Sequence, residues 1–128
     1  MKRNNDLLLQ ILLELERSKL PGKILSPDQF LDFPDLRDEE LAGHVDLLLK
    51  HGLIDGQHSR GGCMVKQITW SGHDFIGAAR NHTIWQTAKQ AAGHLAFSAF
   101  SSLLNRLSEN AAVKACESIL RGDVPEMP

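Results

Sequence analysis

The six histidines and two cysteines of this 128-residue chain suggest a metal site. His44 and His51 are seven residues apart on one face of a predicted helix, about 10 Å along its axis, which is too far to share an ion. His58 and Cys63 flank a glycine-rich turn and could approach each other across it. The sequence contains no Cys-x-x-Cys or His-x-x-x-His pair, the compact spacing of many zinc sites. We therefore expect neither a metal ion nor a cofactor.

His73 and Asp74 are neighbours of the kind that can serve as a catalytic base and its orienting acid. Adjacent residues of a helix do not face each other, and Asp74 is better explained as the capping partner of Ser71. Cys63 has no adjacent base that would activate its thiol. The sequence also lacks a phosphate-binding loop, a nucleophile elbow and a paired-carboxylate site. We expect that the protein is not an enzyme.

Charge and hydropathy exclude further classes of protein. Lys and Arg number 14 and Asp and Glu number 16, which gives a net charge of −2 and excludes a polybasic nucleic-acid binder. Hydrophobic residues make up 42% of the chain, as in ordinary globular proteins. No stretch of 18 apolar residues occurs, and no signal-peptide cleavage site follows the charged N-terminus. We expect a cytoplasmic protein that does not enter a membrane.

Helix signals dominate the N-terminal part of the chain. A first helix follows the capping residues 4–6 and ends at Pro21-Gly22. A short extended segment is predicted at 23–25, and a short helix begins at Ser26 and stops before Pro34. The first helix has one apolar face, formed by Leu8, Ile11, Leu12 and Leu15.

A longer helix carries the most specific signal for the fold. It begins around Asp35 to Asp38, with acids at its N-terminus, where the helix dipole favours negative charge. Gly52 follows its last turn and suits the left-handed position that ends many helices. The apolar face that leads to this glycine consists of Leu41, Val45, Leu48 and Leu49.

A β-hairpin is predicted directly after this helix. Strands at 53–57 and 63–70 are separated by a glycine-rich turn over 58–62. The order of helix, short strand, short helix, longer helix, hairpin and helix is typical of a winged helix-turn-helix. The predicted fold class is therefore mainly α with a small antiparallel β-hairpin, followed by C-terminal helices.

Further helices are predicted after the hairpin. A capping box over 71–74 begins one helix, and a second begins after Asn81. The region 88–107 is rich in Ala, Leu and Phe, and its apolar residues line one helical face. The polar residues 108–110 predict a break before a last helical segment.

We predict that the chain consists of three parts. Residues 1–81 form the winged-helix domain, 82–122 form a C-terminal helical extension, and 123–128 form a flexible tail. Trp70 and Trp85 are expected in the core, with Trp70 fastening the hairpin to the next helix.

Several sequence phrases, spread over roughly residues 1–90, resemble a family of bacterial and prophage proteins known as a domain of unknown function. The resemblance implies a winged helix and a phage or mobile-element setting, and it implies no catalysis. Beyond these phrases the chain is rich in Ala, Phe and Ser, where family members are commonly rich in Lys. The matching phrases are Met1-Lys2-Arg3-x-x-Asp6-Leu7, His44-x-x-Leu47-Leu48-x-x-x-Gly52-Leu53-Ile54, Ile68-Thr69-Trp70-x-Gly72-His73-Asp74-Phe75 and Thr83-Ile84-Trp85.

The first functional hypothesis is a small DNA-binding regulator of phage or mobile-element origin. Many winged helices place the third helix in the major groove and the wing on the DNA backbone. Residues 37–50 contain two basic and four acidic residues, a balance of 2 − 4 = −2, which opposes contact with phosphates. The residues expected to contact duplex DNA are Arg37, Glu40 and His44 on the third helix and Arg60 and Lys66 on the wing.

The alternative is a protein-interaction adaptor, or a phage-encoded inhibitor of a host protein, that does not bind DNA. The acidic third helix would then face a basic partner. The apolar C-terminal region also predicts a homodimer, unless it folds back on the first helix as core. The residues predicted at the dimer interface are Leu95, Phe97, Phe100, Leu103, Leu104 and Leu107.

Overall fold

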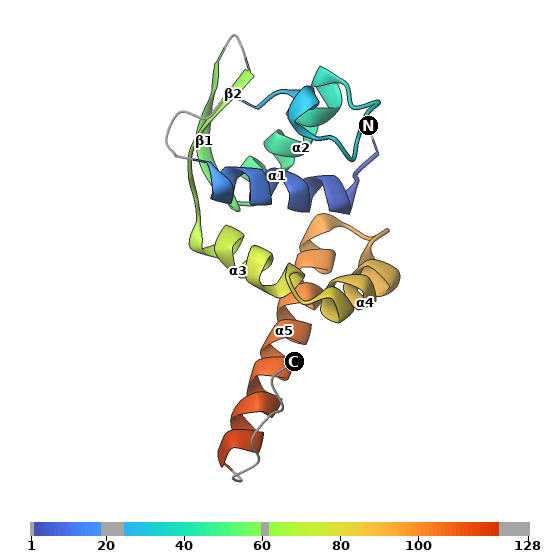
Figure 1. The fold of residues 1–128 in the computed structure, drawn as a ribbon, viewed down its shortest axis with the longest axis vertical. Helices are drawn as coiled ribbons and strands as arrows, with labels where there is room; N and C mark the ends of the chain where they lie inside the picture. The colour runs from blue at the N-terminus through green and yellow to red at the C-terminus, as the bar shows by residue number, and fades with distance from the viewer. Residues whose placement is uncertain (1, 19–24, 60–61, 121–128) are drawn as a thin grey trace. The chain divides into compact units, whose positions relative to one another are not determined.

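The computed structural model describes residues 2–18, 25–59 and 62–120 (Figure 1). The described part is mainly helical with one two-stranded antiparallel hairpin, which confirms the predicted fold class. The chain divides into two compact units, Met1–Gly77 and Ala78–Pro128. In the part of the chain that the structure describes, no helix is both long enough and apolar enough to cross a membrane. The elements in chain order are α1 (Asn5–Arg17), the 3-10 helix η1 (Pro27–Gln29), α2 (Asp38–Lys50), β1 (Ile54–Ser59), β2 (Gly62–Ile68), α3 (Trp70–Ala79), α4 (His82–Ala92) and α5 (Phe97–Leu120).

Helix α1 begins at a capped N-terminus, as the sequence predicts. The Asn4 side chain accepts hydrogen bonds from the backbone N–H groups of Asp6 and Leu7, at 3.0 and 3.2 Å. These bonds satisfy donors that the first turn of a helix leaves free. The Pro21-Gly22 end signal lies outside the described residues. The apolar face is buried and consists of Leu7, Leu8, Ile11, Leu12 and Leu15.

The short helix predicted after Ser26 is a single 3-10 turn. The backbone N–H of Ser26 donates to Oε1 of Gln29 at 3.1 Å, which is half of the predicted capping box. The chain then makes turns in which Phe33 N–H donates to Phe30 O and Leu36 N–H donates to Phe33 O. Because these turns take up the backbone groups that a helix would use, the segment up to Pro34 does not extend η1. The predicted strand at 23–25 falls mostly outside the described residues.

Helix α2 ends at Gly52 in the predicted manner. The φ angle of Gly52 is +73°, in the left-handed region that residues with a Cβ rarely adopt. Leu53 N–H donates to Leu48 O at 2.9 Å, and Gly52 N–H donates to Leu49 O at 3.2 Å. This is the pair of bonds of a Schellman motif. It turns the chain from α2 directly into β1.

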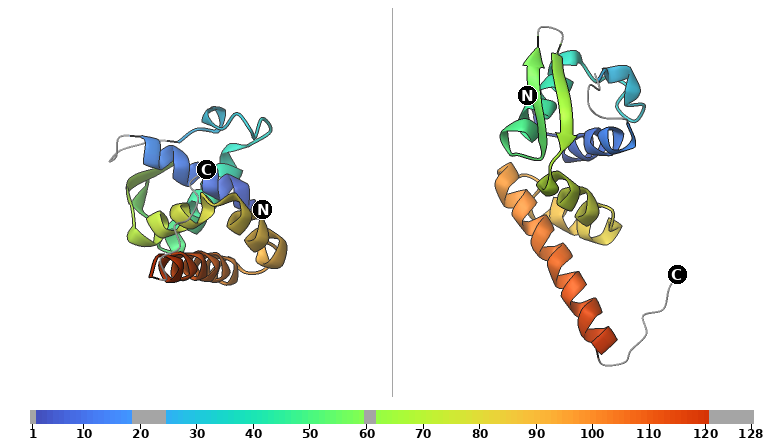
Figure 2. Two further views of the ribbon diagram at one scale, coloured as in Figure 1. Left: turned by 60° about the horizontal axis from the view of Figure 1, so that its bottom comes forward. Right: turned by 90° about the vertical axis from the view of Figure 1, so that its left-hand side faces the viewer.

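The two strands form the predicted hairpin, with slightly different ends. Asp55 pairs with Gln67 and Gly56 pairs with Val65, so Lys66 is the extra residue of a β-bulge. A Cβ added to Gly56 would lie 2.4 Å from the carbonyl oxygen of Met64, so this position requires glycine. Figure 2 shows the strands as one ribbon beside α1 and α2, with which they pack.

Helix α3 begins earlier than the capping pattern over 71–74 predicts. The cap is Thr69, whose hydroxyl accepts from Gly72 N–H at 3.1 Å and donates to Gly52 O at 2.6 Å. The prediction that Ser71 caps this helix is therefore wrong, because Ser71 lies inside the first turn. A Cβ added to Gly72 would lie 2.1 Å from the Leu53 carbonyl oxygen. Thr69 and Gly72 thus fasten the start of α3 to the end of α2.

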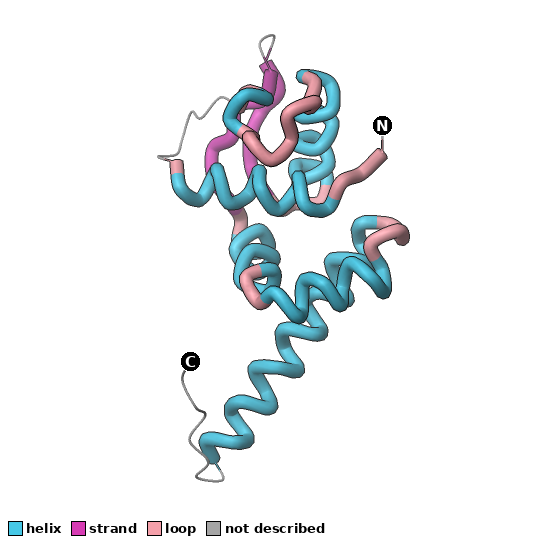
Figure 3. The backbone as a smooth tube through the Cα atoms, turned by 45° about the vertical axis from the view of Figure 1, so that its right-hand side comes forward, coloured by secondary structure: helices cyan, strands magenta, loops and turns pink. Residues whose placement is uncertain are grey.

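The second unit is built from α4 and α5, which pack together. Asn81 caps α4 by accepting from Ile84 N–H at 3.1 Å. The rings of Trp85 and Phe100 meet edge to face, with centroids 5.5 Å apart, and Trp85 is buried as predicted. The predicted break at 108–110 is wrong, because α5 is continuous through these residues (Figure 3). Glu109 and Asn110 are exposed, and a helix tolerates polar residues on its solvent side.

Candidate functional site

The basic residues at the two ends of α2, Arg37 at its N-cap and Lys50 in its last turn, are held by carboxylates of this helix. Arg37 Nε lies 3.0 Å from Oε1 of Glu40 and 3.9 Å from Oε2 of Glu39. The hydrogen bond to Glu40 and the charges of both glutamates raise the pKa of Arg37. Lys50 Nζ lies 3.0 Å from Oδ2 of Asp46, one turn earlier. Arg37 and Glu40, both expected at DNA, therefore satisfy each other, and the exposed side of α2 carries a surplus of negative charge.

His44 does not face solvent, which corrects its predicted role at a DNA interface. Its side chain is 1% exposed. Its Nε2 accepts from the backbone N–H of Asn4 at 2.9 Å, and its Nδ1 lies 2.6 Å from the carbonyl oxygen of Glu40. With Nε2 as the acceptor, Nδ1–H is assigned as the donor to Glu40 O. His44 joins the start of α1 to α2 and cannot reach a base.

The sequence contains the signal that would have placed His44 correctly. Position 44 lies three residues after Leu41 and four before Leu48, so it falls within the apolar face of α2. The two residues expected on the wing lie on a separate element. Lys66 is exposed at the bulge of β2, and Arg60 lies outside the described residues.

Three of the six predicted interface residues are instead part of the core of the chain. Phe97, Phe100 and Leu104 are buried, and the rings of Phe97 and Phe100 lie 6.4 Å apart. Their burial within one chain leaves them unavailable to a second copy, which corrects the prediction for these residues. Leu103 and Leu107 are half-buried and Leu95 is exposed. The homodimer itself stays a prediction.

Trp70 is 85% exposed, so the prediction that it lies in the core is wrong. It occupies the first position of α3, directly after the cap at Thr69. Its ring lies 6.3 Å from that of His73, one turn further along, at an interplanar angle of 58°. An open cleft of about 500 Å³ lies beside these rings and is lined by Gln67, Ile68, Thr69, Trp70 and His73.

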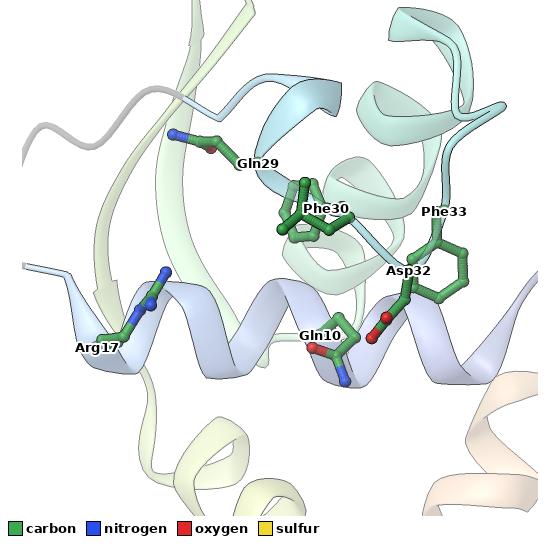
Figure 4. A pocket seen from close by; sticks show the side chains of 7 residues that line it. Gln10, Arg17, Gln29, Phe30, Asp32 and Phe33 are labelled. Atoms are coloured by element: carbon green, nitrogen blue, oxygen red, sulfur yellow. The ribbon is translucent and has the colours of Figure 1, made fainter.

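Sequence reasoning also missed a second hollow, in the segment that follows η1. Leu31 is 88% exposed and borders a groove of about 280 Å³ (Figure 4). Leu31 stands between Pro27 and Pro34 in a segment with aspartates at positions 28, 32 and 35. Such an apolar residue among prolines and acids in a turn is one signal that could have indicated an exposed position.

Comparison with known proteins identifies a family and a relative of this chain. Residues 2–98 match a family described as "Hypothetical protein (DUF2513)". The chain is 36% identical over 94 residues to an uncharacterized protein of Haemophilus influenzae, an alignment that covers 70% of this chain and 76% of that protein. No solved structure matches the chain. The family match spans α1 through α4, including the Trp70 cleft and the Leu31 groove.

Proposed function

The chain belongs to the DUF2513 family of hypothetical proteins, and from this premise we propose that it is a protein-binding module of the winged-helix type. The observation that carries the proposal is the exposure of Trp70 beside an open cleft. Tryptophan is enriched among the residues that dominate protein–protein contacts, because it removes a large apolar area from water. Trp70 is the anchor for the partner, and the cleft receives a side chain from it.

The electrostatics of α2 support protein rather than DNA as the partner. Arg37 and Lys50 are both paired with carboxylates, and His44 is buried. Phosphate contacts supply most of the non-specific affinity for DNA, and paired cations on an acidic helix supply little of it. The order of α1, η1, α2, hairpin and α3 supports the winged-helix description. The mobile-element setting implied by the resemblance makes a host protein a natural partner.

A DNA-binding regulator is the second candidate, and the exposed Lys66 favours it. Lys66 is the extra residue of the β-bulge in β2. In a DNA complex, the wing of a winged helix contacts phosphates at such positions. In this case Lys66→Ala and Arg60→Ala each weaken binding to random duplex DNA. Each also makes the slope of log affinity against log salt concentration shallower by about one. If both variants bind DNA as the original protein does, the wing has no part in DNA binding.

Affinity capture from an extract of the cells that naturally produce the protein tests the protein-binding proposal. The original protein and the Trp70→Ala variant serve as the two baits. Loss of a Trp anchor costs about 2 kcal/mol or more, so we expect at least about thirtyfold weaker retention of the partner. Met64→Ala is the matched control, because Met64 is an exposed apolar residue of the same unit that does not line the cleft. Equal retention of the same partner by Trp70→Ala would contradict the proposal.

A further inference from the structure

The Leu31 groove is a hollow in the first unit, lined by four polar or charged residues and three apolar ones. In Figure 4 the side chain of Arg17 rises from α1 on the side of Gln29, and that of Gln10 lies over α1. Phe30 is buried and belongs to the core below, whereas Leu31 stands 88% exposed beside it. Burial of this leucine against a partner would gain the free energy of removing its side chain from water. Exposed apolar residues of this kind are typical of contact surfaces. The lining residues are Gln10, Arg17, Gln29, Phe30, Leu31, Asp32 and Phe33.

The groove lies in the most acidic stretch of the chain. Residues 28–46 contain seven acids and one base, a balance of 1 − 7 = −6. In the described ranges, Asp32, Asp35 and Asp38 are exposed and make no ion pair. The Ser26 hydroxyl donates to Asp28 and lowers its pKa, which keeps that carboxylate charged.

The cations beside the groove do not offset this charge. Arg17, at one end of the groove, is bound to Glu14 on the same helix. Arg37, the one base of the acidic stretch, is bound to Glu40. The carboxylates that remain unpaired therefore present a negative rim beside a groove whose apolar part is formed by Phe30, Leu31 and Phe33. Phosphate backbones and anionic lipid surfaces are repelled by such a rim.

We propose that the Leu31 groove binds a basic amphipathic segment of a partner protein. An apolar side chain of that segment enters the groove against Leu31 and Phe30, and its lysines or arginines face Asp32 and Asp35. The groove, of about 280 Å³, has room for a side chain of a polypeptide. Opposite charge speeds the encounter, and burial of Leu31 provides the affinity. This inference rests on the proposed protein-binding function.

The test uses the full chain and a fluorescent synthetic peptide that forms an amphipathic helix with leucines on one face and lysines on the other. We expect saturable binding, seen as fluorescence anisotropy, that weakens with salt. Leu31→Ser should weaken binding by at least about tenfold, because the buried leucine is lost. The double variant Asp32→Asn, Asp35→Asn should bind several-fold more weakly and with a smaller salt dependence.

The matched control is Asp55→Asn, which removes the same charge from an exposed position on β1. It should change the affinity by less than about twofold, because the rim does not include it. All of these positions are exposed, and circular dichroism checks that each variant is folded. The inference is overturned if Leu31→Ser binds the peptide as the original protein does, or if Asp55→Asn weakens binding as much as the double variant.

Failure of this inference and failure of the proposed function give different results. If the peptide does not bind, or if Trp70→Ala abolishes its binding while Leu31→Ser does not, the groove is excluded and protein binding through Trp70 stands. If Trp70→Ala leaves partner capture unchanged and Leu31→Ser reduces peptide binding, the groove is supported and the Trp70 anchor is excluded.

Discussion

His44→Ala is the substitution whose effect on stability can be worked out most fully from the structure. It removes the acceptor for Asn4 N–H and the donor to Glu40 O, each worth about 1 kcal/mol. It also removes the imidazole from a site that is 1% exposed, and the cavity adds about 1–2 kcal/mol. We therefore expect the free energy of unfolding to fall by about 3–4 kcal/mol.

Urea unfolding followed by circular dichroism measures this loss as a lower midpoint at an unchanged slope. His73→Ala is the matched control in the same unit, because His73 is exposed and should change stability by less than about 0.5 kcal/mol. Nitrogen NMR of the original protein should show a proton on Nδ1 of His44 and none on Nε2. A loss below 1 kcal/mol for His44→Ala, or a proton on Nε2, would refute this account of the α1–α2 contact.

Three further predictions follow from other elements. Gly52→Ala should cost about 1–2 kcal/mol in urea unfolding, because its φ is +73° and no neighbouring atom would touch the new Cβ; an unchanged midpoint would contradict the left-handed helix end. Acrylamide should quench the fluorescence of Trp70 strongly and that of Trp85 weakly; equal quenching in two single-tryptophan variants would contradict their different burial. Asp28 should titrate by NMR below its ordinary pKa, and Ser26→Ala should raise that pKa. The stabilising contribution of this carboxylate is present at neutral pH and is lost as the pH falls through its folded pKa; an Asp28 pKa unaffected by Ser26→Ala would assign the shift elsewhere.

Local signals in the sequence predicted the fold well. Gly52 marks the end of α2 because a left-handed residue and its two hydrogen bonds depend on neighbours in sequence. The hairpin is marked in the same way by its glycines. The sequence pattern places the cap of α3 at Ser71 and not at Thr69, because the two hydroxyl residues are only two positions apart. Thr69 caps the helix, and its hydroxyl also reaches Gly52 O, a contact that is distant in sequence.

The candidate site was predictable only in part, because it depends on exposure. Trp70 and Trp85 are the same residue type, yet one is exposed and the other is buried. Hydropathy alone assigns both to the core. For Phe97 and Phe100, the apolar pattern is the same whether a partner or the rest of the chain covers them. For His44, the helical pattern already placed the residue on the buried face of α2.

The central claim is that this family member binds protein and does not read DNA with α2. Its most direct test is the titration of a fluorescent random-sequence DNA duplex with the full chain at about 50 mM salt, where non-specific binding is strong. We predict no change in anisotropy, because Arg37 and Lys50 are already paired with carboxylates of the same helix. Saturable binding that falls steeply with salt and is weakened by Arg37→Ala would contradict the claim.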